Sequence, residues 1–175
     1  MKTIEIFTLK GISYVPSTRT CDSYAEAAAV CLENQGHQKE VTFKIEGEKT
    51  AKIKLDWLSI DQKIRDNWLD LQEATEYGAI CLAIWAVHET TDYKVIRRSP
   101  KLTGFDYWLG DKASNYPFQD KARLEISGIL KGTKSQIKQR MNEKLKQTKR
   151  TDHLNLPAVI AVVEFSSPLA KIKLK

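Results

Sequence analysis

The chain has 175 residues, of which 42% are hydrophobic and 29% are charged, which suits one domain of ordinary size with a packed core. No apolar run approaches the roughly 20 residues that a membrane span requires, and the N-terminus lacks the apolar region of a signal peptide. The net charge of +6 is concentrated in residues 131–150, which contain eight Lys or Arg residues and one acid, Glu143. We therefore expect a soluble, cytoplasmic protein without a membrane partner, and the basic segment favours a polyanion such as nucleic acid.

The cysteines and histidines form no recognisable framework. Cys21, Cys31 and Cys81 are odd in number and have no CxxC spacing, so free buried thiols are expected rather than disulfides. The three histidines are equally scattered, and with the cysteines they give no zinc pattern.

Residues 1–57 predict a small α+β unit, which we treat as an N-terminal extension. Its expected elements are a strand over 3–9, a helix over 23–34 and two strands over 41–46 and 51–57. Cys21, Asp22 and Ser23 are candidate caps for the helix, whose first turns are rich in alanine. The sequence Glu-Gly-Glu-Lys at 46–49 predicts a hairpin turn between the two strands.

A long helical region is expected from Ser59 to His88, with a break near Asn67. Ser59 and Gln62 match a capping box at its start. Residues 79–87 are apolar on nearly every face, so this part of the helix should be buried. Glu73 and Glu76 lie three residues apart, on one face of the same helix.

Three strands, a basic helix and a last strand are expected in the remainder of the chain. The strands span 93–97, 104–109 and 121–130, and the helix spans 134–149 with an apolar stripe of Ile137, Met141 and Leu145. Residues 157–165 are apolar at consecutive positions, which is typical of a central strand covered on both faces.

The third of these strands shows strict alternation in "DKARLEISG", residues 120–128. Its apolar residues are Ala122, Leu124 and Ile126, and its polar row is Lys121, Arg123, Glu125 and Ser127. Because strand side chains alternate between faces, the polar row is either a solvated face or one wall of a site.

From Leu69 to Pro168, just over half of the chain, the expected order is helix, three strands, helix, strand. "TGFDYWLG" places Asp106 at a strand start, and "ARLEIS" places Glu125 on the next strand. This arrangement resembles the PD-(D/E)XK (restriction endonuclease-like) nuclease superfamily, with Asp106 like its first acidic motif and Glu125 like the acid of its E-x-K motif. The resemblance implies an α/β (α+β) core over residues 58–175, with a central mixed sheet flanked by helices.

The same resemblance implies hydrolysis of phosphodiesters in DNA, or less readily RNA, in a restriction or mobile-element defence context. Asp106 and Glu125 would hold Mg²⁺ or Mn²⁺, because hard cations choose oxygen ligands and can make a bound water nucleophilic. Glu76, or else Glu73, matches the helix glutamate that many members add to the metal site. Many nucleases of this fold act as dimers, so a homodimer is compatible with the resemblance.

The sequence departs from the family at Ser127, where the motif has a lysine that positions the attacking water and neutralises developing charge. Lys121 and Arg123 share the face of Glu125 and are candidates to replace that lysine, as is Lys138 on the following helix. Without such a cation, the domain would be a catalytically inactive nucleic-acid-binding or assembly subunit, which is the alternative function.

The basic helix supplies candidate contacts to phosphate, namely Lys134, Lys138, Arg140, Lys144 and Lys146. Such contacts give affinity and salt dependence without sequence preference. Tyr107 and Trp108 alternate on one strand, so one of them is a candidate for base stacking while the other belongs to the core. A third interpretation is a protein-binding module in which the basic helix is only a solvated face.

Overall fold

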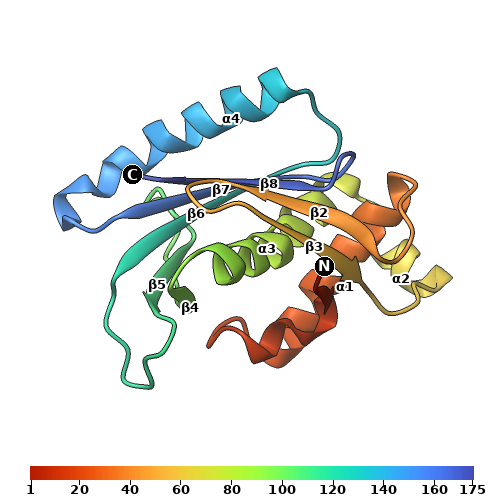
Figure 1. Ribbon diagram of the computed structural model, residues 1–175, viewed down its shortest axis with the longest axis horizontal. Helices are drawn as coiled ribbons and strands as arrows, with labels where there is room; N and C mark the ends of the chain where they lie inside the picture. Colours follow the sequence, from red (N-terminus) through yellow and green to blue (C-terminus); the bar gives the residue numbers. More distant parts are fainter.

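One mixed sheet of eight strands runs through the computed structural model, which describes residues 1–175 (Figure 1). The strands are β1 (Thr3–Glu5), β2 (Val41–Glu46), β3 (Ala51–Asp56), β4 (Tyr93–Arg98), β5 (Tyr107–Asp111), β6 (Ala122–Ile129), β7 (Ala158–Glu164) and β8 (Leu169–Leu174). Their order in the sheet is β1-β3-β2-β8-β7-β6-β5-β4. The pairs β1–β3, β2–β8 and β6–β7 are parallel, and the other neighbours are antiparallel.

Helices cover both faces of this sheet. They are α1 (Thr18–Asn34), α2 (Gln62–Asn67), α3 (Leu71–Thr90) and α4 (Lys134–Gln147), with 3₁₀ helices η1 (Ile6–Gly11) and η2 (Thr148–Leu154). Figure 1 shows α4 on one face and α3 on the other, with α1 on the α3 side. The helix α4 forms the crossover that parallel strands require, here between β6 and β7.

The strand β7 lies at the centre of these layers, and all of its residues are buried. Val159, Ala161 and Val163 belong to the larger apolar cluster with α3, whereas Ile160 and Val162 pack against the α4 stripe of Ile137 and Met141. The predicted central strand and the apolar stripe of the basic helix are therefore both confirmed.

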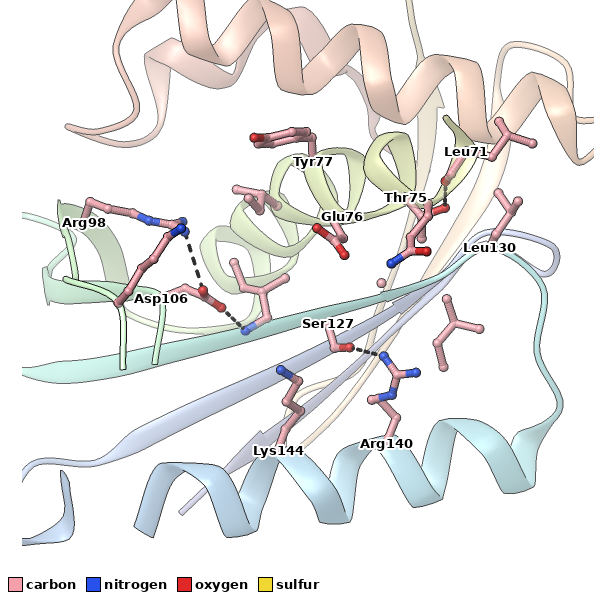
Figure 2. A pocket seen from close by; sticks show the side chains of 16 residues that line it. Leu71, Thr75, Glu76, Tyr77, Arg98, Asp106, Ser127, Leu130, Arg140 and Lys144 are labelled. Atoms are coloured by element: carbon pink, nitrogen blue, oxygen red, sulfur yellow. Dashed lines mark hydrogen bonds and ion pairs between the residues drawn. The ribbon is translucent and has the colours of Figure 1, made fainter. Parts of the chain in front are cut away.

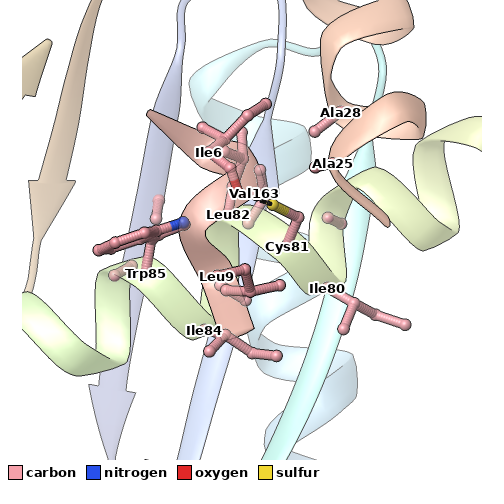
Figure 3. Packing of buried hydrophobic residues seen from close by; sticks show 14 of the residues in the cluster. Ile6, Leu9, Ala25, Ala28, Ile80, Cys81, Leu82, Ile84, Trp85 and Val163 are labelled. Atoms are coloured by element: carbon pink, nitrogen blue, oxygen red, sulfur yellow. Dashed lines mark hydrogen bonds between the residues drawn. The ribbon is translucent and has the colours of Figure 1, made fainter. Parts of the chain in front are cut away.

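The larger apolar cluster spans the N-terminal and C-terminal parts of the chain. Residues 79–87 of α3 are all buried, as their sequence predicts. Figure 3 shows this helix packed against Ile6 and Leu9 of η1 and against Ala25 and Ala28 of α1. The strands β1, β2 and β3 also continue the sheet of the later strands, so residues 1–57 share both sheet and core with residues 58–175. No helix has the length and apolar character needed to cross a membrane.

Several expected boundaries are wrong. The first strand ends at Glu5, because the Glu5 side chain accepts a hydrogen bond from the Phe7 amide and starts the 3₁₀ turn of η1. The helix α1 begins at Thr18 instead of Ser23, and its additional turn buries Cys21. The cap at Ser59 is replaced by Asp61, whose carboxylate accepts from the Ile64 amide.

The break near Asn67 is confirmed, because α2 ends there and Asp70 caps the separate helix α3. The expected hairpin of β2 and β3 is also confirmed. The strand expected from Gly104 begins only at Tyr107, since Gly104 has a φ of +86° and belongs to the preceding loop. The strand β8 was not predicted, although Ala170, Ile172 and Leu174 alternate with Lys171 and Lys173.

Candidate functional site

The polar row on β6 is buried rather than solvated. Arg123 and Glu125 are each 2% exposed and Ser127 is 8% exposed. These three residues point to the face that α4 and η2 cover, and each receives or donates hydrogen bonds there. Buried charged side chains require partners, so the row is held by a specific set of contacts.

Arg123 is held at the far end of the row, by the segment that follows α4. Its guanidinium donates to the Thr148 carbonyl at 3.1 Å, the Thr151 hydroxyl at 2.7 Å and the Leu156 carbonyl at 2.7 Å. Lys121 lies outside β6, and its ammonium is 3.9 Å from Asp111. Neither cation lines the two hollows beside Glu125, so the structure does not bring these candidates to the carboxylates.

Asp106 is positioned by the open edge of β6. The strand β5 pairs only with residues 122–124 of β6, so the later residues of β6 lack a neighbour on that side. The Asp106 backbone amide donates to the Leu124 carbonyl, and its side-chain Oδ2 accepts from the Ile126 amide at 2.9 Å. Arg98 at the end of β4 lies 3.7 Å from Oδ1 of the same carboxylate. These contacts hold Asp106 at the open edge of β6, where its carboxylate is close enough to Glu125 to raise the pKa of Glu125.

Glu125 lies between a carboxylate and an ammonium group. Lys144 Nζ is 2.6 Å from Glu125 Oε1, and Gln147 Nε2 donates to the same oxygen at 3.0 Å. Burial and the neighbouring Asp106 carboxylate raise the pKa of Glu125 to about 7, while Lys144 opposes that rise. The two carboxylates, together with Lys144, form the electrostatic centre of the candidate site.

A hollow of about 830 Å³ lies in front of this centre, between the N-terminal half of α3 and the middle of α4. Its charged lining residues are Glu76, Arg98, Lys101, Asp106, Arg140 and Lys144. Figure 2 shows Glu76 and Tyr77 on the α3 side and Arg140 and Lys144 on the α4 side, with Asp106 and Ser127 between them. The lining therefore carries two more cations than anions, which favours an anionic ligand.

The basic helix divides its cations between two faces. Arg140 donates to the Ser127 hydroxyl at 2.9 Å, and Arg140 and Lys144 both line the hollow. Lys138 and Lys146 are exposed and border a different surface depression, and Lys134 lines neither. Lys138 is therefore not placed to contact Glu125, whereas Lys144 contacts it directly.

The remaining predicted residues are divided between the hollow, the surface and the core. Glu76 is exposed and lines the same hollow, while Glu73 is exposed outside it. Tyr107 is 2% exposed, which confirms that one of the two alternating aromatics belongs to the core. Trp108 is half-buried, with the Phe105 ring at 4.8 Å and the Arg97 guanidinium over its ring at 5.2 Å.

The donor set fits Mg²⁺ or Mn²⁺ only with help from water or substrate. No three His, Cys, Asp or Glu side chains gather closely enough for an all-protein metal centre. Mg²⁺ commonly takes one or two carboxylates and completes its shell with waters and phosphate oxygens. Asp106 and Glu125 match that pattern. A divalent cation would also offset the Asp106 repulsion that, after burial, raises the pKa of Glu125.

Four residues of the site were not predicted from the sequence. Arg98, Lys101, Tyr77 and Gln147 line the hollows or contact Glu125, and none of them belongs to a motif that marks that role. The paired arginines that end β4 were an available signal for Arg98. Lys101 and Gln147 lie in a loop and on the last turn of a helix, where the reach of a side chain depends on the tertiary arrangement.

The comparisons with known proteins give no relative. The chain matches no model of a protein family, no curated protein and no solved structure.

Proposed function

We propose that this protein hydrolyses phosphodiester bonds in nucleic acid, DNA in the first instance, as a divergent PD-(D/E)XK-like nuclease. The observation that carries the proposal is the contact of 2.6 Å between Lys144 and Glu125, beside Asp106 and at the edge of a cationic hollow. The order α3, β4, β5, β6, α4, β7, with the four strands adjacent in the sheet, supports the same fold.

In this proposal Lys144 takes the role of the motif lysine that Ser127 cannot fill. A lysine on the strand, two residues after the acid, would point toward the same face as Glu125. Here α4 crosses that face and delivers an ammonium group from another element. Lys144 would orient the attacking water and stabilise the charge that develops on the phosphoryl oxygens.

The carboxylates would hold the divalent cation, which supplies charge neutralisation and a more acidic bound water. Asp106 is presented by its hydrogen bond from the Ile126 amide, and Glu125 by its contacts with Lys144 and Gln147. Arg98, Lys101 and Arg140 line the same hollow and would bind the phosphates on either side of the bond to be cut.

One observation favours the alternative function, a nucleic-acid-binding subunit without catalysis. Lys144 and Gln147 already satisfy Oε1 of Glu125, and a lysine so placed compensates the buried carboxylate without a metal ion. In that case the cationic hollow would bind nucleic acid and leave it uncut.

The test is cleavage of DNA and RNA with Mg²⁺ or Mn²⁺ by the parent, Lys144→Met and Lys146→Met proteins. We expect Lys144→Met to lower the cleavage rate by about 100-fold or more, because removing one preorganised charge donor has that effect in other enzymes. Lys146→Met removes the same charge from the exposed face of α4 and should cut like the parent.

A second change tests the relocation itself. Ser127→Lys combined with Lys144→Met places the ammonium where the family has it, and we expect it to recover part of the lost rate. Binding of DNA by the parent without any cutting would support the subunit alternative instead. Equal cutting by the parent and Lys144→Met would remove Lys144 from the mechanism.

A further inference from the structure

A second hollow adjoins the one in front of the carboxylates. It has a volume of about 540 Å³ and lies beside the loop between β4 and β5, and Glu125, Gln147 and Arg150 help to line it. Arg98, Lys101 and Asp106 line both hollows. The carboxylate pair therefore lies at the junction of two adjoining hollows, which we together call the depression.

Cations flank the junction from two different elements. Arg98 ends β4 and Lys101 follows it in the loop, while Arg140 and Lys144 project from α4 on the other side. Charges on opposite sides suit a ligand with more than one phosphate group, such as a nucleic-acid strand that passes across the carboxylates.

An aromatic side chain lies on the wall of the larger hollow. Tyr77 of α3 lines it and is 37% exposed. Its ring stacks on Tyr24 of α1 at 5.5 Å and meets Trp68 edge-on at 5.7 Å, so two neighbours fix its orientation. Tyr24 covers one face of this ring, so a base would stack on the part that remains exposed, as bases stack on aromatic side chains in single-strand sites.

The carboxylates are recessed between these walls. Glu125 is 2% exposed, and the side chain of Asp106 is 29% exposed. A duplex is stiff over about 150 base pairs, and its bases are stacked inside, away from an aromatic wall. A single strand can bend into the depression and present both a phosphate and an unstacked base.

We propose that the depression binds single-stranded nucleic acid, with phosphates among Arg98, Lys101 and Arg140 and a base stacked on Tyr77. This inference names the substrate class of the proposed nuclease and rests on that function for the cleavage step only. Binding of the strand is expected with or without hydrolysis.

The test is the affinity of the whole protein, in EDTA, for oligothymidylate, for oligouridylate and for a duplex with the same number of phosphates. We expect either single strand to bind more tightly than the duplex, by about tenfold or more, since a base stacked on an aromatic ring contributes appreciably to affinity. The comparison of oligothymidylate with oligouridylate distinguishes DNA from RNA.

Tyr77→Leu should weaken binding of the single strand by about fivefold or more and leave duplex binding unchanged. Tyr14→Leu is the matched control, because Tyr14 is 54% exposed and lines neither hollow. Thermal melting of both variants shows whether each has kept its fold.

The outcomes separate the two proposals. Equal or tighter duplex binding, or equal effects of Tyr77→Leu and Tyr14→Leu, would overturn the single-strand assignment while leaving nuclease activity open to its own test. Tight single-strand binding that depends on Tyr77, with no cleavage by the parent, would support this inference and overturn hydrolysis.

Discussion

At the scale of single residues, Glu125 links stability to pH. Burial and the nearby Asp106 raise its pKa from 4.5 to about 7, so the folded protein holds this proton more tightly than the unfolded chain does. The resulting stabilisation is fully present below about pH 4.5 and is lost as the pH rises through about 7. The ionised carboxylate therefore lowers the free energy of unfolding at alkaline pH.

Glu125→Gln removes this linkage while keeping an oxygen that can accept from Lys144. In EDTA, the free energy of unfolding of the variant should rise relative to that of the parent between pH 4.5 and 7. The difference should reach up to roughly 3 kcal/mol, or about 6–12 °C in Tm, and should then level off. Melting curves across this pH range measure it. Glu48→Gln, in the exposed turn between β2 and β3, is the control for loss of a negative charge. Parallel curves for Glu125→Gln and the parent would contradict the assignment.

The chemistry of the site could be predicted only in part at this scale. The alternation around Glu125 correctly places Arg123, Glu125 and Ser127 on one face, because strand periodicity is a local property. Which cation contacts which carboxylate depends on tertiary packing, which the local sequence does not specify. Arg123 was a candidate to replace the motif lysine and instead donates hydrogen bonds to η2. Lys144 was a candidate phosphate contact and instead contacts Glu125.

At the scale of elements, the approach of α3 to β6 depends on Gly128. A Cβ atom at this position would lie 2.5 Å from the Thr75 carbonyl oxygen and 2.9 Å from the Ala79 Cβ. Backbone atoms of a buried helix cannot move aside as the end of a flexible side chain can. The glycine therefore sets the distance between the helix that carries Glu76 and the strand that carries Glu125.

We expect Gly128→Ala to lower the free energy of unfolding by about 2–3 kcal/mol, through overpacking between α3 and β6. Urea denaturation measures the loss. Gly11→Ala is the matched control, because no atom lies within 4 Å of the place that its added methyl group would take, and its stability should change little. Equal stability of Gly128→Ala and the parent would show that α3 can shift without cost.

The orientation of α4 on the sheet could also be predicted only in part. The stripe of Ile137 and Met141 correctly identifies the docking face, because helical periodicity is encoded in the residue spacing. Arg140 and Lys144 flank this stripe on one side and Lys138 on the other. Which flank faces Glu125 follows from the angle at which α4 crosses β6, and the spacing does not contain that angle.

At the scale of the whole molecule, the strongest sequence patterns predicted most of the layers. The buried α3, the basic α4 and the central β7 are all long or strongly patterned segments. The strand β8 was missed, and so was its position between β2 and β7, which joins the two ends of the chain in one sheet. Strand order depends on pairings between distant segments, and neither segment alone specifies its partner.

All three thiols lie inside the packed layers, as the sequence predicts, and no disulfide links them. Burial raises the pKa of Cys31 to about 12 and raises that of Cys81 further, so both are held as unreactive thiols. In native buffer, we expect a chromogenic thiol reagent to label none of the three cysteines within the time that labels an unfolded control completely. Rapid labelling of one cysteine at full native ellipticity would contradict this packing.

The placement of these thiols has a practical consequence. Cys21 and Cys31 are on α1 and Cys81 is on α3, so the three cysteines are buried in the layer formed by the two helices that cover one face of the sheet. Their modification by a mass-tagged alkylating agent would record each transient separation of those helices, residue by residue. The three native cysteines can therefore report on the opening of the α1–α3 contact without any engineered label.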